Sequence, residues 1–277
     1  MPDLPVLRRA LLASALTALV GCAAERGRPE AFVCQPAATA RQAVGLLVAG
    51  SGAALPLAEA AQLEIGEQAG IALRIASSIG SRGAREALGA GDIDIALAAE
   101  PTLPQTPGVR WTAVARTDVV LVTTRRGELA PLDERTLAAA IASAPPRWSD
   151  GRPMRILLRP TDDSGMVALA RSRPRLYAAL DAAREGEDVQ ILDTDQEMAR
   201  ALRATTDAIG LLDRGMLGLL QVPAWPIDAG ARGPSAQRVV AVGVRVDAGA
   251  EVRNAAEALI AAMRTRAERE AGYGALR

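Results

Sequence analysis

Short apolar segments alternate with helix-like segments in the first part of the chain. Apolar runs of strand length occupy residues 44–49, 71–75 and 93–98, and a glycine-containing loop followed by a helix-like segment comes after each of the first two. Strands joined through a helix pair in parallel, and such crossovers are right-handed. The pattern therefore predicts a βαβαβ unit over residues 44–98, with the loops before both helices at the same edge of one sheet.

A second set of alternating segments follows. Strands are predicted at residues 119–124, 154–158, 189–192, 208–212 and 239–246. Thr194 and Glu197 have the spacing of a capping box for a helix that ends near residue 204, and a long helix is predicted at residues 251–269. Alternating strands and helices indicate an α/β class with mainly parallel sheets and flanking helices.

Composition excludes several kinds of chemistry. The chain of 277 residues has no histidine, and all 32 of its basic residues are arginine. This excludes a Ser-His-Asp nucleophile, a P-loop lysine and the usual histidine-containing metal sites, so we expect no catalysis, cofactor or metal. The 32 acidic residues balance the arginines, and only 2% of residues are aromatic, so nucleic acid is not an expected partner. Guanidinium and backbone N–H groups remain, and both bind anions.

The N-terminal segment has the features of a secretory signal. Arg8 and Arg9 precede a largely apolar run at residues 10–21 that is too short to span a bilayer. We therefore assign residues 1–21 to a signal peptide.

The signal ends in a sequence, Leu19-Val20-Gly21-Cys22, that resembles a bacterial lipobox. The resemblance implies a lipid on Cys22, an extracytoplasmic (periplasmic) protein anchored to the membrane, and a linker at residues 22–40. The alternative is a plain signal peptide with an incidental cysteine. In the lipidated form Cys34 is the one free thiol, so no internal disulfide is expected.

Three loops before predicted helices share small residues. They span residues 50–54, 80–83 and 163–165, and Arg159 precedes the third. A loop from the carboxyl end of a strand to a helix directs unpaired N–H groups and the positive end of the helix dipole toward the crevice above the sheet. One such loop is typical of an ordinary βα turn, whereas three in this context indicate an anion site to which Arg159 adds a charged donor.

Four segments together resemble the phosphate-binding proteins of bacterial ABC importers. These segments, which agree in order and spacing, are residues 46–57, 77–101, 148–164 and 208–217. The resemblance implies a type II periplasmic-binding-protein fold, in which two α/β lobes close on a ligand in a central cleft. The first lobe would comprise residues 41–118 plus 236–277 and the second residues 119–235, with hinges near residues 119–124 and 236–246.

The resemblance also implies a set of ligand-binding residues. They are Gly52, Ala53, Ala54 and Leu55 of the first loop, Gly80 and Ser81 of the second, and Arg159, Ser164 and Gly165 of the third. The loop argument adds Arg82 and Gly83, and Asp162 is included as a candidate for the acidic ligand of the family. For Arg82 the choice between a solvated surface residue and a pocket residue is open.

Three positions depart from the family pattern. Ala54 and Met166 stand where the family has threonine, and Ala99 stands where it has an acidic residue, with Glu100 adjacent. A protonated phosphate needs an acceptor for its O–H, whereas sulfate has no proton and is repelled by a buried carboxylate. Phosphate selectivity therefore depends on whether Glu100, Asp162 or Asp163 replaces the acidic residue of the family. An Asp at the start of a helix is, however, more often an N-cap than a ligand.

The sequence predicts a monomeric extracytoplasmic lipoprotein that binds a small tetrahedral oxyanion, phosphate favoured, for delivery to an ABC importer. An ABC permease and, through the lipid, the membrane are the other partners. Two alternatives remain. One is an envelope sensor or scaffold of the same fold with a degenerate ligand site. The other is a hydrolase using Ser51 or Ser81, although the chain lacks both Gly-x-Ser-x-Gly spacing at these serines and a histidine base.

Overall fold

The computed structural model describes residues 45–69, 72–126, 133–227, 236–274 and 276. The predicted signal peptide (residues 1–21), linker (residues 22–40), Cys22 and Cys34 lie outside the described residues. Within the described ranges, none of the helices combines the length and the apolar character needed to span a bilayer.

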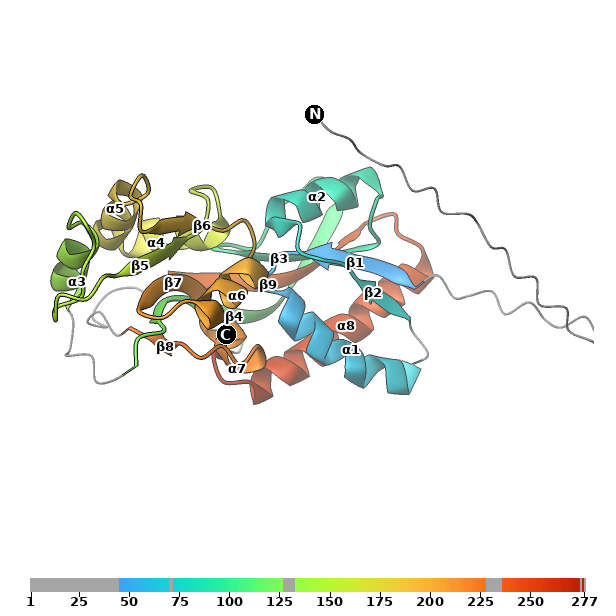
Figure 1. Ribbon diagram of the computed structural model, residues 1–277. Coiled ribbons are helices and arrows are strands. Elements are labelled where there is room, and N and C mark those ends of the chain that lie inside the picture. Colours follow the sequence, from blue (N-terminus) through green and yellow to red (C-terminus); the bar gives the residue numbers. More distant parts are fainter. Residues whose placement is uncertain (1–44, 70–71, 127–132, 228–235, 275, 277) are drawn as a thin grey trace, which may run out of the picture. The chain divides into compact units, whose positions relative to one another are not determined.

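In the described residues, ten strands form one sheet in the order β2-β1-β3-β9-β4-β7-β5-β6, and β8 and β10 both pair with β4 (Figure 1). The strands are β1 (Leu46–Gly50), β2 (Leu73–Ile75), β3 (Ile95–Glu100), β4 (Val109–Thr123), β5 (Arg155–Leu158), β6 (Val189–Ile191), β7 (Ala208–Asp213), β8 (Trp225–Pro226), β9 (Ala236–Arg245) and β10 (Tyr273–Gly274). The helices are α1 (Leu55–Ala69), α2 (Gly80–Ala90), α3 (Glu134–Ile141), α4 (Ser164–Ser172), α5 (Pro174–Ala182), α6 (Asp195–Ala204), α7 (Arg214–Leu219) and α8 (Ala250–Arg269).

The predicted βαβαβ unit is confirmed. Strand β1 pairs in parallel with β2 on one side and with β3 on the other, and α1 and α2 are the crossovers. A Cβ at Gly50 would lie 2.0 Å from the backbone oxygen of Leu97, so the approach of β1 to β3 admits only glycine at this position. The loops before α1 and α2 therefore start from neighbouring strands at one edge of the sheet.

The centre of the sheet is antiparallel. The long strands β4 and β9 pair antiparallel over most of their length, and β3 and β7 continue the antiparallel pairing on either side. Parallel pairing returns between β7, β5 and β6. The α/β class with flanking helices is confirmed, while the expectation of mainly parallel sheets holds for the two ends only, because β4 and β9 run in opposite directions through the middle.

Apolar side chains alternate between the two faces of the sheet. On β3, Ile95 and Leu97 belong to the cluster under α1 and α8, whereas Ala96 and Ala98 belong to the cluster under α2. At the other end, β5 and β7 share a cluster with α3, α4 and α5. The cluster under α1 and α8 also contains Met198 of α6, so apolar packing crosses the predicted lobe boundary. The division into two lobes and the hinge stay predictions.

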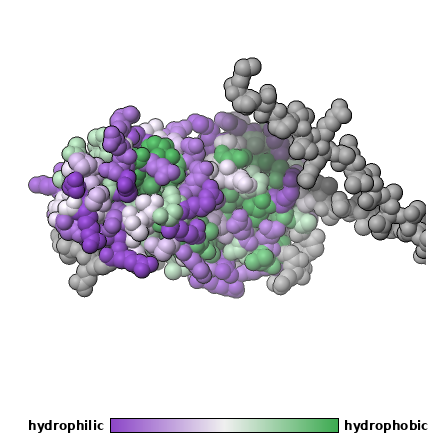
Figure 2. Space-filling model, viewed as in Figure 1, coloured by the Kyte–Doolittle hydropathy of each residue, from purple (hydrophilic) through white to green (hydrophobic). Residues whose placement is uncertain are grey.

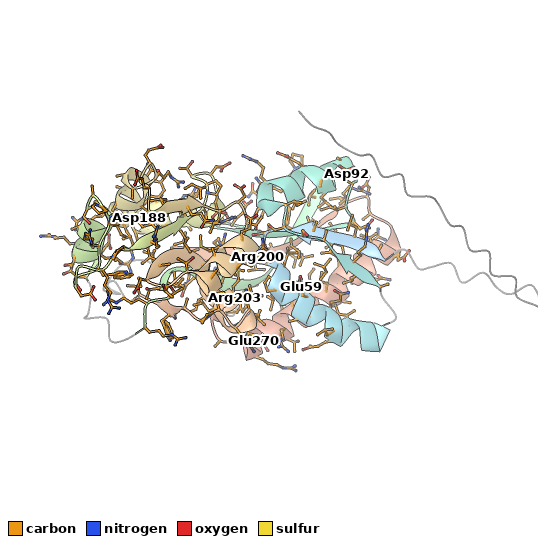
Figure 3. All side chains as sticks on the ribbon, in the orientation of Figure 1. Glu59, Asp92, Asp188, Arg200, Arg203 and Glu270 are labelled. Atoms are coloured by element: carbon orange, nitrogen blue, oxygen red, sulfur yellow. The ribbon has the colours of Figure 1, made fainter. Side chains whose placement is uncertain are left out.

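Hydrophilic residues are interspersed with apolar ones on the face shown in Figure 2. The large apolar residues that are exposed in the described part of the chain are Leu63, Ile79, Leu103, Ile191, Trp225 and Val246. Charged side chains such as Arg200 and Arg203 of α6, labelled in Figure 3, are solvent-exposed. These two arginines present the solvated helix face that is the usual place for such side chains.

Candidate functional site

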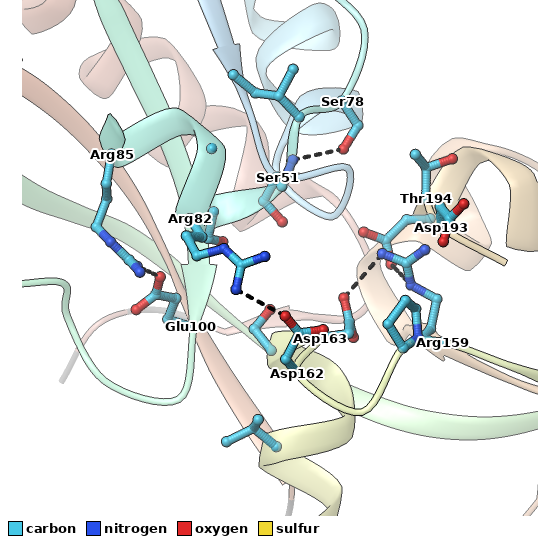
Figure 4. A pocket seen from close by; sticks show the side chains of 18 of the residues that line it. Ser51, Ser78, Arg82, Arg85, Glu100, Arg159, Asp162, Asp163, Asp193 and Thr194 are labelled. Carbon is cyan, nitrogen blue, oxygen red and sulfur yellow. Dashed lines mark hydrogen bonds and ion pairs between the residues drawn. The ribbon is translucent and has the colours of Figure 1, made fainter. Parts of the chain in front are cut away.

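A cavity of about 740 Å³ opens where four loops leave the carboxyl ends of parallel strands (Figure 4). Ser51 follows β1, residues 78–83 follow β2, residues 159–164 follow β5 and residues 193–195 follow β6. The carboxyl edge of a parallel sheet is the usual position of a ligand site in α/β proteins. The second and third predicted loops thus contribute to one cavity, and the first contributes Ser51.

The loop before α2 presents an uncapped helix N-terminus to the cavity. Gly80 has φ of 71°, its N–H donates to the Ser78 hydroxyl at 3.4 Å, and the N-cap side chain accepts no hydrogen bond. Because the amides of the first helical turn have no partner within the helix, the N–H groups of Ser81 and Arg82 are available at the cavity wall. The Ser81 hydroxyl is engaged elsewhere, since it accepts from the Ala99 N–H at 3.1 Å and donates to the Ala99 oxygen at 3.4 Å.

Arg82 and Asp162, both in the predicted set, pair with each other across the cavity. Their side chains meet at 2.9 Å, and 71% and 62% of the respective side-chain surfaces are exposed (Figure 4). An ion pair this exposed contributes little to stability. Arg82 is therefore a solvated residue that also lines the cavity.

Arg159 is buried at the floor of the cavity, with 5% of its surface exposed. It donates through Nη1 to the Leu192 oxygen at 2.7 Å and through Nη2 to Asp163 Oδ2 at 3.0 Å. Its Nε has no hydrogen-bond partner and lies 4.0 Å from Asp195 Oδ1. The guanidinium is thus neutralised by carboxylates of the chain itself.

Asp163 also caps α4. Its Oδ1 accepts from the N–H groups of Gly165 at 2.9 Å and Met166 at 3.3 Å. This is the N-cap that the sequence favoured for an Asp at a helix start. Gly165 is absent from the cavity lining and its N–H is bound to this carboxylate, while the Asp163 N–H donates to the Pro160 oxygen at 3.0 Å.

The four residues predicted from the first loop do not line the cavity. Gly52 is buried and the three residues after it are at most 1% exposed. The N–H groups of Ala54 and Leu55 donate to the Ser51 oxygen at 2.9 and 3.1 Å. The start of α6 covers the loop, because a Cβ at Gly52 would lie 2.6 Å from Gln196 Oε1 and 2.8 Å from Asp195 Oδ2.

A buried charged cluster beneath the cavity was not predicted. Arg238 of β9 donates through Nε to Asp213 Oδ1 at 3.1 Å, and through Nη1 to the Ser164 hydroxyl at 2.7 Å. Its Nη2 forms an ion pair with Asp213 and lies 3.8 Å from Asp195 Oδ1. The signal available in the sequence is an arginine next to the apolar run of residues 239–244 in β9, and an aspartate that closes the apolar strand β7.

Asp195 is the carboxylate at the centre of this cluster, with 4% of its surface exposed. Burial raises the pKa of Asp195, and the neighbouring Asp163 carboxylate raises it too. The charges of Arg238 and Arg159 and a hydrogen bond from the Ala53 N–H lower this pKa. Arg159 and the first loop, both expected to bind an external oxyanion, therefore face a carboxylate of the protein, and Arg238 is a second guanidinium beside it.

The cavity wall as a whole carries more acid than base. Four arginines line it, against six acidic residues, which gives a formal charge of −2. The arginines are Arg82, Arg85, Arg159 and Arg171, and the acids are Glu86, Glu100, Asp162, Asp163, Asp193 and Asp195. Arg85 is paired with Glu100, so that acid is not a free acceptor. In the described ranges no group of three or more Cys, Asp or Glu residues is placed to hold a metal ion.

Solved structures show the same fold. A phosphate ABC transporter substrate-binding protein with bound phosphate from Clostridium perfringens has a TM-score of 0.63 at 13% identity, over 84% of this chain and 100% of that one. An ABC-type phosphate transport receptor from Vibrio cholerae gives 0.54 at 12% identity, over 83% and 100%. The reduced form of OxyR from N. meningitidis gives 0.57 at 15% identity, over 84% and 99%.

Comparison with curated protein sequences finds no match. Residues 35–263, most of the chain, match the family described as the PBP superfamily domain. The fold expected from the resemblance to phosphate-binding proteins is confirmed by this match and by the solved structures. The chain belongs to the PBP superfamily domain family, as a divergent member whose fold matches that of phosphate ABC transporter substrate-binding proteins.

Proposed function

We propose that this protein is an extracytoplasmic solute-binding lipoprotein that binds a small tetrahedral oxyanion, phosphate favoured, for delivery to an ABC importer. The solute is bound and released, and no covalent bond changes. One observation carries the proposal: Ser81, Arg82, Arg159 and Ser164, which come from two loops far apart in the sequence, line a single cavity at the carboxyl edge of the sheet.

The free amides at the start of α2 supply the part of the site that is ready for an anion. These N–H groups and the positive end of an 11-residue helix face the cavity without a capping side chain. Arg82, which is solvated and held only by an exposed ion pair, can turn from Asp162 to a ligand at small cost. We therefore expect the anion between the start of α2 and the loop after β5.

A thermal-shift screen tests this proposal. Purified protein is heated with phosphate, sulfate, molybdate, tungstate or a small carboxylate, because a ligand selective for the folded state raises its melting temperature. At a concentration of about 100 times Kd the stabilisation is about 2.7 kcal/mol. We expect phosphate to give the largest shift, and calorimetry then gives Kd. The same melting temperature in all five anions would contradict the proposal.

The lipid anchor is a separate part of the proposal. We expect the mature protein to begin at Cys22 and to carry a lipid there, which intact mass spectrometry of protein from the membrane fraction measures directly. A Cys22→Ala variant should lose the lipid mass and leave the membrane fraction. Gel filtration of that variant should give the mass of a monomer.

The second candidate function is an envelope sensor or scaffold with a degenerate ligand site. Two observations favour it: the carboxylates of Asp163 and Asp195 already engage the donors expected for the oxyanion, and the cavity wall is negative. The fold is also shared with a structure described as the OxyR regulatory domain, so fold does not separate the two functions. A flat titration of ligand-free protein with every oxyanion in the screen would favour this candidate.

A further inference from the structure

The start of α6 is attached to the first loop by side chains that are buried and polar. The Asp195 side chain packs directly against Gly52, and Gln196 donates through Nε2 to the Gly52 oxygen at 3.5 Å. We call this the α6 contact. A Cβ at Gly52 would overlap both side chains, so the two segments are packed with no space between them.

Two orphaned polar atoms lie beside the α6 contact. Arg159 Nε and Gln196 Oε1 are buried and have no hydrogen-bond partner. Arg159 Nε lies 4.0 Å from Asp195 Oδ1, and Arg238 Nη2 lies 3.8 Å from the same oxygen. Both separations are longer than a hydrogen bond, so the Asp195 carboxylate fills the position of an anion without satisfying all of its donors.

We propose that Asp195 is an internal ligand of this site, which occupies the amide and guanidinium donors and must move away before an external oxyanion can use them. The inference rests on the proposed function, because it assumes that these donors bind an oxyanion. A carboxylate and an oxyanion are both negative and need the same N–H groups, so the two exclude each other. Release of Asp195 also releases the α6 contact, because Asp195 and Gln196 are adjacent.

Substitution of Asp195 tests the competition. Asp195→Asn keeps the size of the side chain and removes its charge, and Asp193→Asn removes one charge from the same cavity wall at an exposed position. Calorimetry with sulfate and with phosphate at one pH is expected to show at least tenfold tighter binding in Asp195→Asn than in the unaltered protein. Asp193→Asn should stay within about twofold, since it touches none of the donors. Equal or weaker binding in Asp195→Asn overturns the inference.

The outcomes separate the inference from the function. If the unaltered protein binds phosphate and Asp195→Asn binds it no more tightly, the function stands and the inference fails. If only Asp195→Asn binds an oxyanion, the inference stands and the transport function fails. If neither protein binds, both fail.

Hydrogen exchange on the unaltered protein gives a second measurement that needs no variant. With saturating phosphate or sulfate, we expect slower exchange in a peptide covering residues 78–83 and faster exchange in one covering residues 193–198, because the α6 contact opens. Slower exchange in both peptides would mean that Asp195 stays beside the bound anion, and would overturn the inference.

Discussion

Arg159 lies at the floor of the cavity, where its guanidinium is a buried donor of hydrogen bonds. Its two ion-pair partners, Asp163 at 3.0 Å and Asp195 at 4.0 Å, leave Nε without a hydrogen bond. An anion that enters the cavity can therefore gain a charged donor that the protein has not fully used. Arg171 lines the same cavity on α4 and is solvent-exposed.

We predict that Arg159→Ala weakens oxyanion binding by at least about tenfold, or roughly 1.4 kcal/mol. The reason is the loss of a buried charged donor, which is stronger than a solvated one. Arg171→Ala removes the same charge from the cavity wall and should change Kd by no more than about threefold. Calorimetry on both variants measures the difference, and equal affinities would remove Arg159 from the site.

Arg238 has a structural role that is separable from binding. Arg238 and Asp213 are 2% and 0% exposed, and removal of one partner leaves the other as an uncompensated buried charge. We predict that Arg238→Met lowers the free energy of unfolding by about 3–5 kcal/mol. Arg155 is half-exposed and pairs with Asp188 at 2.8 Å. We therefore expect Arg155→Met to lower the free energy of unfolding by less than about 1 kcal/mol. Urea titration compares them, and similar losses would be inconsistent with this prediction.

The sequence identified some of these residues for a physical reason. Arg159 stands immediately after β5, and Ser81 and Ser164 stand in the first turns of the helices that follow β2 and β5. Because the ends of parallel strands meet at one edge, local patterns sufficed. Asp195 stands in the first turn of a helix, where an acidic residue is ordinary. Its burial depends on contact with Gly52, which is distant in the sequence, and the burial of Arg238 depends on the pairing of β9 with both β3 and β4.

At the scale of elements, α6 holds the residues that define the α6 contact, and its N-terminus is fixed by the predicted capping box. Thr194 Oγ1 accepts from the Glu197 N–H at 3.1 Å, and the Glu197 carboxylate accepts from the N–H groups of Thr194 and Asp193 at 3.0 and 2.9 Å. These hydrogen bonds lower the pKa of Glu197. Their contribution to stability is present above the unfolded pKa and is lost as the pH falls through the folded one.

We predict that Thr194→Ala lowers the free energy of unfolding by about 1 kcal/mol, which is the usual cost of losing an N-cap. Thr265→Ala is the matched control, because Thr265 is exposed within α8 and alanine is the better helix former there. Thermal unfolding should therefore show a lower melting temperature for the first variant and an equal or higher one for the second. A melting temperature unchanged by Thr194→Ala would mean that the cap is dispensable.

Element prediction succeeded where the pattern is local and failed where it is not. The capping box and the strands of the first βαβαβ unit follow from residues that are neighbours in sequence. The first half of β4 was not predicted, since Arg110 and Arg116 interrupt its apolar pattern. Its strand conformation comes from pairing with β9, in which Trp111 lies opposite Gly243 and its ring fills the space that a side chain at Gly243 would need.

At the scale of the whole molecule, the residues that the structure describes fall within one compact unit, and the division of that unit into two lobes stays a prediction. The resemblance to phosphate-binding proteins predicted the fold, but sequence patterns do not show how tightly the two predicted lobes are joined. That depends on long-range contacts: the continuous sheet through β4 and β9, the cluster shared by α1, α8 and α6, and the α6 contact. Closure around a ligand would have to change the α6 contact before the other two, because the α6 contact lies next to the cavity.

Protons should therefore affect ligand binding through Asp195. The groups that face it are Arg159, Arg238, Asp163, Tyr273 and the Ala53 N–H, and burial, the largest influence, raises its pKa. The unfolded value is about 3.9, so folded protein binds more protons than unfolded chain between this pH and the folded pKa. The contribution of Asp195 to stability is full below the unfolded pKa and falls as the pH rises through the folded one.

We predict that sulfate binds more tightly as the pH falls from 8 toward the unfolded pKa of Asp195, because a protonated Asp195 is neutral and competes less for the donors. Sulfate keeps its charge over this range, so the change in affinity comes from the protein. In Asp195→Asn the dependence should largely disappear, since the amide does not titrate, whereas Asp193→Asn should retain it. Calorimetry at four pH values in buffers of different ionisation enthalpy would also count the protons taken up. An equally steep dependence in Asp195→Asn would assign the proton to another acid of the cavity wall.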